Sequence, residues 1–260
     1  MNNVNKTLYI PLYGKSYVSR KGILLRDTKA EAIWAAEGFP LKGKSRSKWL
    51  AYYMGMRAAV FDRWVNAQMD AEPGAVILHI GCGMDSRAER VGIRQGVWFD
   101  IDFPEVIGER SRYYQESENY KMLSADVRTP DWLAQIPTGH AVVIIEGVSM
   151  YLRRPELIQL LSAIRGHFAR VSVLTDCYTE LAAKVSRVRN PINDVGVTEV
   201  YGLNDPKALE ESGLTFVKEH DMTPRDLIGQ LHGMERAVFQ SLYAGSIAKK
   251  MYRTYEYQSV

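Results

Sequence analysis

Carboxylate side chains follow three segments that are predicted to be strands. Asp102, Asp126 and Glu146 each lie at or just beyond the end of such a segment. Ligands bind beyond the carboxyl ends of the strands in doubly wound sheets, so these acids would meet at one crevice. Asp102 follows Gly81 by 21 residues, close to the spacing of about 20 at which an acid accepts from ribose hydroxyls. Asp126 and the amide of Val127 could read an adenine edge, and Glu146 could hold a cationic group.

A glycine-containing turn precedes these acids. The segment Gly81-Cys82-Gly83-Met84-Asp85 follows the first predicted strand. Glycine lets the backbone turn tightly and approach a ligand closely, and Asp85 could cap the helix that follows. Cys82 is interpreted as a small residue in this turn, although nearby Arg87 could lower the pKa of its thiol. A lone Gly-x-Gly is common in turns, so the ordered set of acids carries the inference.

The turn departs from the dinucleotide fingerprint G-x-G-x-x-G. Ser86 occupies the position of the third glycine, and Asp85 precedes it. A carboxylate is unfavourable beside the pyrophosphate that such a helix N-terminus binds. S-adenosylmethionine has no phosphate and carries a positive sulfonium, so it suits an acidic crevice better, and its carboxylate would need a cation from elsewhere. An NAD-dependent oxidoreductase and a non-catalytic module that binds S-adenosylmethionine are the competing interpretations.

Strand-length and helix-length segments alternate from residue 75 onward. The predicted strands are Ala75–Ile80, Val97–Ile101, Lys121–Ala125, Ala141–Ile145 and Val171–Thr175. Helix-length segments such as Pro155–Phe168 lie between most of them. Apolar strands that alternate with helices are typical of parallel strands buried on both faces. The pattern predicts an α/β fold with a doubly wound, mostly parallel sheet.

The segment 47–69, before the first strand, is predicted to be a helix. Its apolar residues recur at helical spacing: Trp49, Tyr53, Met56, Val60 and Trp64. Arg57 lies within this stripe, roughly 20° from Trp64 and about 40° from Tyr53 around the helix. Its guanidinium would need either a buried anionic or hydrogen-bonding partner or a path to water. Both interpretations stay open at this point.

The two ends of the chain differ from this alternating centre. Residues 1–60 are rich in Lys and Arg, as expected of a solvated face or of a cover that meets an anionic substrate. Residues 178–205 have weak periodicity and are predicted to be a loop or partial lid. Two more strands are predicted, Leu214–Asp221 and Met251–Gln258, the second inserted antiparallel. A helix between them, over 224–249, should break near Gly229 or Gly233.

These elements give a seven-stranded sheet in one domain, 1–260. Within it we expect a helical N-terminal cover (1–70), a cofactor-binding core (75–177), a lid-like insertion (178–213) and a C-terminal antiparallel strand pair with helices (214–260). We also expect residues 1–60 and 178–205 to close over the substrate, because the site would otherwise lie open to water.

The composition excludes several classes of partner. The net charge of +3 over 260 residues is too small to indicate nucleic acid or a membrane surface. No apolar run approaches the roughly 20 residues of a membrane helix, and the N-terminus has no apolar signal-peptide core. Cys82 and Cys177 lack metal-ligand spacing. We therefore expect a cytoplasmic protein without disulfides or metal and with a small-molecule partner; the oligomeric state stays open.

Three motifs resemble a known family. They are Gly81-Cys82-Gly83-Met84-Asp85-Ser86-Arg87, Phe99-Asp100-Ile101-Asp102-Phe103-Pro104-Glu105-Val106-Ile107 and Glu146-Gly147-Val148-Ser149-Met150-Tyr151-Leu152. As a set they resemble the leucine carboxyl methyltransferase family, which includes protein phosphatase methyltransferases and tetracenomycin-type polyketide O-methyltransferases. The resemblance runs from about Lys15 to Gly213. The chain is shorter than the phosphatase enzymes and lacks a recognisable phosphatase-tail insert, so it is more similar to the bacterial small-molecule branch.

The resemblance implies a class I methyltransferase fold with S-adenosylmethionine as cofactor. Lys15 and Arg57 match the positions whose cations hold the methionine carboxylate, which would supply the anion for Arg57. Gly81, Cys82 and Gly83 would form the turn beside the cofactor.

The remaining implied roles lie at the strand ends. Asp102 would take the ribose, and Asp126 with Val127 the adenine. Glu146 would lie near the amino group of the methionine portion. Tyr151 would lie near the transferable methyl, although it is equally explained as an aromatic that packs where the fourth strand leads into its helix.

The implied reaction is in-line transfer of a methyl group to an oxygen of a small acceptor, polyketide-like or another metabolite. A carboxylate is already ionised near neutral pH, whereas a hydroxyl needs a base within hydrogen-bond reach. No histidine occupies an obvious base position, and His79 within the first strand is more typical of a hydrogen-bonded core residue. The sequence therefore favours a carboxylate acceptor, on an argument from absence.

Overall fold

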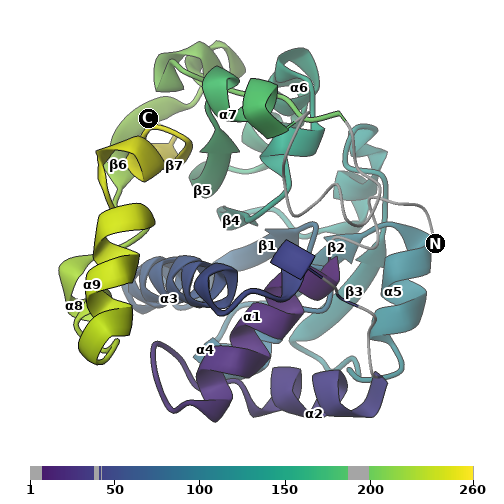
Figure 1. The fold of residues 1–260 in the computed structure, drawn as a ribbon. Helices are drawn as coiled ribbons and strands as arrows, with labels where there is room; N and C mark the ends of the chain where they lie inside the picture. The colour runs from purple at the N-terminus through teal and green to yellow at the C-terminus, as the bar shows by residue number, and fades with distance from the viewer. Residues whose placement is uncertain (1–7, 38–40, 42, 187–198, 260) are drawn as a thin grey trace.

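The computed structural model describes residues 8–37, 41, 43–186 and 199–259. Seven strands form one sheet in the order β3-β2-β1-β4-β5-β7-β6 (Figure 1). Their bounds are β1 (Val76–Ile80), β2 (Trp98–Asp102), β3 (Tyr120–Ser124), β4 (His140–Ile145), β5 (Arg170–Tyr178), β6 (Thr215–His220) and β7 (Tyr252–Gln258). Strands β1 to β5 are parallel, and β7 lies antiparallel between β5 and β6. The predicted fold, including the inserted last strand, is confirmed.

Helices pack on both faces of this sheet. They are α1 (Tyr9–Arg20), α2 (Thr28–Glu37), α3 (Lys48–Ala71), α4 (Arg87–Val91), α5 (Pro104–Arg110), α6 (Arg154–His167), α7 (Glu180–Ser186), α8 (Arg225–Ile228), α9 (Gly233–Leu242) and α10 (Ser246–Lys249). Short 3-10 turns include η3 (Pro130–Gln135), η4 (Ser149–Tyr151) and η6 (Pro206–Ser212).

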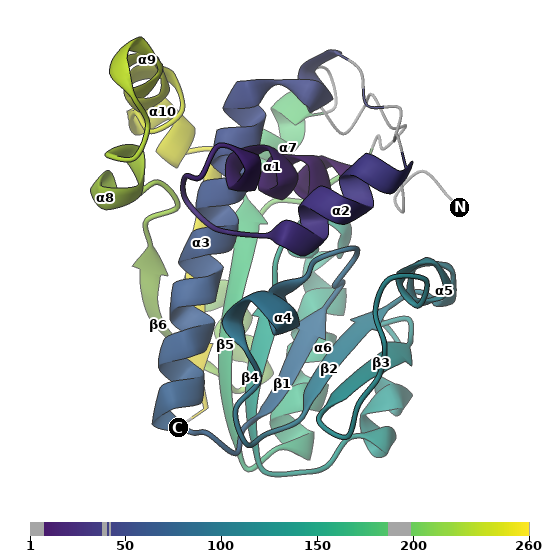
Figure 2. The ribbon, with the colours of Figure 1, turned by 90° about the horizontal axis from the view of Figure 1, so that it is seen from below.

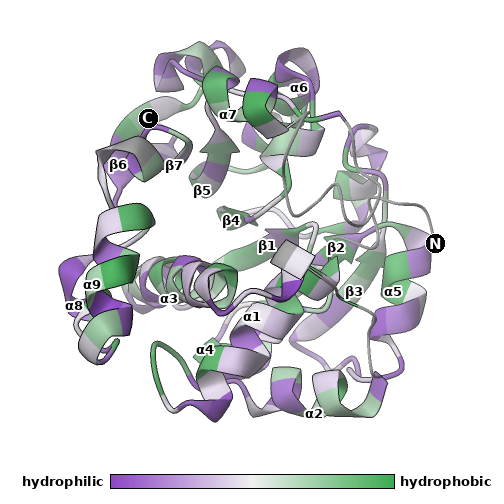
Figure 3. Cartoon of the chain, viewed as in Figure 1, coloured by the Kyte–Doolittle hydropathy of each residue, from purple (hydrophilic) through white to green (hydrophobic). Residues whose placement is uncertain are grey.

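Alternate residues of each central strand enter different cores. Ile77 and Val142 pack with α1, α2 and α3, whereas Leu78 and Val143 pack with η3, α6 and η6. All five residues of β1 are buried. Two buried faces explain the uninterrupted apolar runs that predicted these strands. Figure 3 shows the hydrophobic colouring on β1 and β2 in the middle of the molecule.

The N-terminal helices form a cover at the carboxyl ends of the strands. Figure 2 shows α1 and α2 crossing above the arrowheads of the sheet. Helix α1 approaches α3 closely because each contributes a glycine. A Cβ on Gly14 would lie 2.6 Å from Cβ of Met54, and one on Gly55 would lie 2.8 Å from Cγ2 of Val18. This contact fixes α1, and hence Lys15, over the sheet.

Two predictions of secondary structure need correction. Residues 180–186 form helix α7 within the segment predicted as a loop, and residues 187–198 lie outside the described residues. The predicted C-terminal helix breaks at 229–232, as expected near Gly229 or Gly233, but it breaks a second time at 243–245, so it becomes α8, α9 and α10. Gly233, at the start of α9, has φ of +51°, and Leu227, Ile228 and Phe239 pack against α3.

No helix in the described part of the chain is long and apolar enough to cross a membrane.

Candidate active site

One cavity of about 720 Å³ lies at the carboxyl ends of the strands. All ten predicted site residues line it: Lys15, Arg57, Gly81, Cys82, Gly83, Asp102, Asp126, Val127, Glu146 and Tyr151. The sheet order places β2 and β3 on one side of the central strands β1 and β4, and β5 and β7 on the other. The cavity therefore has a side over β2 and β3 and a side over β5 and β7.

The turn after β1 brings backbone to the cavity wall. Gly81 and Gly83 have φ of +65° and +52°, in the region that side chains with a Cβ avoid. A Cβ on Gly81 would lie 2.2 Å from Cγ2 of Val148, which begins the segment after β4. The glycines are thus required by conformation and by close packing of the β1 and β4 turns.

Gly81→Ala should destabilise the protein by about 1–3 kcal/mol, because it strains the backbone and collides with Val148. Gly166→Ala is the matched control. It lies in α6 with nothing near its added methyl group, so it should be neutral or stabilise the helix by up to about 1 kcal/mol. Chemical denaturation of both variants checks the contrast, and equal stabilities would contradict it.

Asp102 is held rigidly at the end of β2. Its Oδ2 accepts from the amide of Gly83 at 2.8 Å, and its Oδ1 accepts from the amide of Phe103 at 2.8 Å. Burial raises the pKa of Asp102, and these two amide donors oppose the rise. The carboxylate thus links the turn after β1 to the turn after β2. Carboxylate oxygens have further acceptor sites, which a pair of ribose hydroxyls could use.

Asp126 is already engaged by its neighbour Arg128. The Arg128 side chain donates to both carboxylate oxygens, with Nη2 2.5 Å from Oδ2, and its backbone amide donates to Oδ1 at 3.0 Å. These hydrogen bonds lower the pKa of Asp126. The pair is partly exposed at the cavity rim. The predicted adenine contact would therefore have to share the Asp126 carboxylate with Arg128 or use Val127, which is buried beside it.

Arg57 is the centre of a buried ionic cluster. Its side chain is 5% exposed; Nε donates to Glu146 at 2.9 Å, and Nη1 contacts Asp176 at 3.2 Å and the Tyr252 hydroxyl at 2.9 Å. Nη2 has no hydrogen-bond partner among the described residues. A Cβ on Gly147, whose φ is +73°, would lie 3.3 Å from Nη2. The sequence left open whether the Arg57 guanidinium has buried partners or extends to water. The buried partners are confirmed.

Glu146 is shared between two guanidinium groups. It accepts from Arg57 and also from Arg87, whose Nε contacts Asp62 at 2.7 Å. Burial alone would raise the pKa of Glu146, but Arg87 and Arg57 outweigh it and hold the pKa at about 2. Glu146 is therefore an anion at the wall of the cavity, as a site for a cationic amino group requires.

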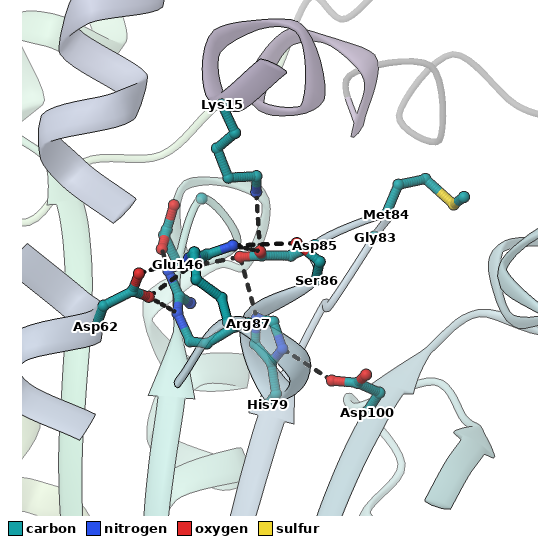
Figure 4. Close-up of polar contacts among 12 residues, drawn as sticks. Lys15, Asp62, His79, Gly83, Met84, Asp85, Ser86, Arg87, Asp100 and Glu146 are labelled. Carbon is teal, nitrogen blue, oxygen red and sulfur yellow. Dashed lines mark hydrogen bonds and ion pairs between the residues drawn. The ribbon is translucent and has the colours of Figure 1, made fainter. Parts of the chain in front are cut away.

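Lys15 reaches down from α1 to Asp85 (Figure 4). The two groups are 3.1 Å apart, and both are buried. Asp85 also pairs with Arg90 at 3.1 Å. The cations keep the pKa of Asp85 well below its usual range, although burial acts in the opposite direction. The prediction that Asp85 caps the next helix is wrong: Ser86 precedes α4, and the Asp85 carboxylate faces cations instead.

A second buried network supports the turn from beneath. Nδ1 of His79 lies 2.9 Å from Asp100, which also pairs with Arg110. Arg110 Nη1 donates to the carbonyl oxygen of Gly83 at 3.0 Å. The interpretation of His79 as a hydrogen-bonded core residue is confirmed, although its ring also reaches the cavity wall. In Figure 4 the ring lies between Asp85 and Asp100.

The thiol of Cys82 is not activated. Burial raises its pKa well above the usual value, and the cation that opposes this rise is Arg110. The suggested influence of Arg87 is wrong, because that guanidinium faces Asp62 and Glu146. Cys82 is a small buried residue of the turn.

Sequence reasoning missed Asp176 and Tyr252. The predicted fifth strand ends at Thr175, one residue before this acid. The rule that found Asp102 and Glu146, an acid at the carboxyl end of a parallel strand, also applies to Asp176. Tyr252 had no such signal, because only the antiparallel pairing of β7 with β5 brings it to the site.

Tyrosine and methionine side chains from α3, η4, the end of β5 and the start of β7 line another part of the cavity. They are Tyr53, Met54, Met150, Tyr151, Tyr178, Met251 and Tyr252. Most pack in one cluster, and the rings of Tyr178 and Tyr252 meet edge to face at 5.1 Å. An amphipathic aromatic wall of this kind suits a planar organic molecule. We call these seven residues the acceptor wall.

Comparisons with known proteins agree with this geometry. The family model described as leucine carboxyl methyltransferase matches residues 12–165. The chain is 32% identical over 186 residues to the tetracenomycin polyketide synthesis O-methyltransferase TcmP of Streptomyces glaucescens, an alignment that covers 70% of this chain and 69% of the relative. It is 28% identical over 183 residues to the S-adenosyl-L-methionine-dependent methyltransferase dpfgK of Gibberella zeae, covering 64% and 61%.

Solved structures share the fold at low identity. A candidate methyltransferase from Thermobifida fusca aligns with a TM-score of 0.58 at 13% identity, over 95% of this chain and 94% of that one. Magnesium protoporphyrin IX methyltransferase from Synechocystis PCC 6803, with S-adenosylhomocysteine bound, aligns with a TM-score of 0.53 at 13% identity, over 98% and 100%.

The chain therefore belongs to the leucine carboxyl methyltransferase family. It is a methyltransferase that uses S-adenosylmethionine, and the oxidoreductase and non-catalytic interpretations are set aside. The cavity fits that cofactor: Asp102 is fixed at the wall, Glu146 is anionic, and one terminal nitrogen of Arg57 has no partner among the residues that the structure describes. When bound, S-adenosylmethionine supplies a methyl group made electrophilic by the adjacent sulfonium.

Proposed function

We propose that this chain transfers a methyl group to an oxygen of a small, polyketide-like acceptor. The division of the cavity carries the proposal. The predicted cofactor residues account for the side over β2 and β3 and for the middle, whereas the acceptor wall on the other side is left for a second molecule. The similarity to TcmP supports an oxygen acceptor of polyketide type.

The proposed roles of the cofactor residues follow the sheet order. Asp102 receives the ribose over β2, and Asp126 with Val127 receives the adenine over β3. Arg57 and Lys15 hold the methionine carboxylate over the middle strands. For Arg57, the donor is Nη2, which pairs with no group in the described part of the chain.

Two further roles belong to Glu146 and Tyr151. Glu146 faces the amino group of the methionine portion. Tyr151, in η4 after the β4 turn, lies near the transferable methyl group. The residues of the site thus align two reactants and exclude water, which is the main contribution a protein makes to an intrinsically reactive methyl donor.

The test is an acceptor screen with product identification. The purified chain is incubated with methyl-labelled S-adenosylmethionine and a panel of aromatic compounds that carry a hydroxyl, a carboxyl, an amino or a thiol group on the same ring system. Methyl ethers or methyl esters are expected. Transfer only to nitrogen or sulfur would contradict the proposal. Asp102→Ala, assayed in parallel, should lose the activity with every acceptor.

We also propose that the N-terminal cover and the lid-like insertion close over the reactants. Ile10 and Pro11 of α1 and Ala182 and Val185 of α7 already line the cavity. Bound S-adenosylhomocysteine should protect both segments from limited proteolysis, because closure removes their backbone from the protease. Cleavage at the same rate with and without S-adenosylhomocysteine would count against closure.

A further inference from the structure

Arg87, the first residue of α4, lies behind the wall of the cavity. Its side chain is 0% exposed and does not line the cavity, whereas its partners Asp85 and Glu146 do. Nε donates to Asp62 of α3 at 2.7 Å, and Nη2 donates to Glu146 and lies 3.4 Å from Asp85. Figure 4 shows Arg87 among these three carboxylates. One guanidinium thus connects two acids of the cavity wall to the long helix α3.

Stability alone does not explain why this arginine is buried. Desolvation of a buried ion pair largely cancels the attraction between its charges, so such a pair is weak evidence for stabilisation. Two of the contacts of Arg87 are also duplicated. Arg90, one turn further along α4, pairs with Asp62 at 2.6 Å and with Asp85 at 3.1 Å. The carboxylate that Arg87 contacts and Arg90 does not is Glu146.

The orientation and the charge of Glu146 both depend on Arg87. The two carboxylate oxygens are divided between two guanidinium groups: Oε1 accepts from Arg57, and Oε2 accepts from Arg87. Burial raises the pKa of Glu146, and Asp85 adds to the rise. Arg87 lowers this pKa most, followed by Arg57 and then Lys15, so that it comes to about 2. Arg87 is therefore the main countercharge of Glu146.

Charged side chains from each neighbouring element face Glu146. Within the described residues they are Arg57 of α3, Arg87 of α4, Lys15 of α1, Asp85 of the turn after β1 and Asp176 of β5. The two acids repel an ionised Glu146, and the other two cations already have a carboxylate partner each. Arg57 pairs with Asp176 at 3.2 Å, and Lys15 pairs with its own acid at 3.1 Å. Without Arg87, Glu146 would have to share one guanidinium with Asp176.

We propose that Arg87 is a positioning residue that holds Glu146 in place, and in its anionic form, for the amino group of S-adenosylmethionine. This inference rests on the proposed role of Glu146 in binding the methionine portion of the cofactor. Arg87 acts through Glu146, because its own side chain lies outside the cavity lining. Loss of Arg87 should therefore weaken the binding of the amino-acid portion of the cofactor and leave the adenosine portion bound at Asp102.

Arg87→Met and Arg90→Met form a matched pair of variants that tests this role. Both arginines lie on α4, both are buried, and both pair with Asp62, but Arg87 alone contacts Glu146. In calorimetry with the full chain, Arg87→Met should bind S-adenosylhomocysteine about tenfold more weakly than the wild type, a loss of about 1.4 kcal/mol. Arg90→Met should stay within about threefold of the wild type. Arg87→Lys should recover part of the lost affinity, because an ammonium restores the charge without the planar fork.

The pH dependence of binding separates a positioning role from a general loss of stability. In the wild type, the pKa of Glu146 is about 2. Its carboxylate therefore stays ionised between about pH 7 and about pH 5, where the amino group of S-adenosylhomocysteine is mostly protonated. In Arg87→Met, burial and the neighbouring acids raise this pKa, so a fall in pH protonates Glu146 and removes its attraction for the ammonium group. The affinity of Arg87→Met should then fall about another tenfold over this range, whereas Arg90→Met should follow the wild type.

Methylthioadenosine, which lacks the amino and carboxyl groups of the cofactor, is the control ligand. Its affinity for Arg87→Met should stay within about threefold of that for the wild type. Equal losses of affinity for both ligands, or an Arg87→Met affinity that follows the wild type at every pH, would overturn the positioning role and leave methyl transfer to oxygen standing. Should Arg87→Met fail to fold, Arg87→Lys gives the same comparison with a smaller effect. No binding of S-adenosylhomocysteine by the wild type would instead contradict the proposed function.

Discussion

Arg57→Ala should remove detectable binding of S-adenosylhomocysteine and destabilise the fold by about 3–5 kcal/mol. The substitution leaves Glu146 and Asp176 buried and close together without their shared cation. It also removes Nη2, the donor proposed for the methionine carboxylate. Chemical denaturation gives the change in the free energy of unfolding, and calorimetry gives the change in affinity.

The control for this experiment lies on the same helix. Arg63 pairs with Asp226 at the surface, where both side chains are more than half exposed. Arg63→Ala should change the free energy of unfolding by less than about 1 kcal/mol and leave binding intact. Equal losses of stability and of S-adenosylhomocysteine affinity in Arg57→Ala and Arg63→Ala would refute the central role of Arg57 in the buried cluster. Arg57→Lys should also bind poorly, since one ammonium cannot replace three guanidinium contacts.

Arg110→Ala should destabilise the protein by a similar amount, about 3–5 kcal/mol. Arg110 and Asp100 are both 0% exposed, so removal of the guanidinium leaves a buried carboxylate without its main countercharge. Arg110 also donates to the carbonyl of Gly83, so the turn that is proposed to lie beside the cofactor should loosen. The loss of stability should be smaller in acid, where the buried Asp100 carboxyl of the variant can take up a proton.

Arg112→Ala separates this effect from a general loss of positive charge. Arg112 is two residues further on and is about half exposed, with surface partners Glu37 and Glu109. Chemical denaturation of Arg112→Ala should show a change in the free energy of unfolding of less than about 1 kcal/mol. If Arg112→Ala lost as much stability as Arg110→Ala, the effect could not be attributed to the buried Arg110–Asp100 pair.

The strand ends could be predicted because local patterns determine them. A buried parallel strand appears in the sequence as an apolar run. The residue after this run must lie where the carboxyl ends of the strands meet. Asp102 and Glu146 were placed in this way. The helical angle of Arg57 likewise placed it in an apolar stripe, and burial then required the partners that the structure supplies.

The partners themselves depend on contacts between distant segments. Asp176 and Tyr252 are 76 residues apart, and only the antiparallel insertion of β7 brings them together. The Lys15–Asp85 pair depends on how α1 crosses the sheet, which the close contact at Gly14 and Gly55 sets. Periodicity within one segment contains no information on such pairings. For that reason the sequence did not indicate Asp176 and Tyr252 as partners of Arg57, and the cap predicted for Asp85 was wrong.

The most direct test of the account is calorimetric titration of the wild-type chain and Asp102→Ala with S-adenosylhomocysteine. The wild type should bind with micromolar affinity, and Asp102→Ala should bind at least tenfold more weakly, a loss of about 1.4 kcal/mol. That result would place the cofactor over β2, in the cavity described above. Unchanged affinity in Asp102→Ala, or no binding by the wild type, would contradict the assignment of this cavity to S-adenosylmethionine.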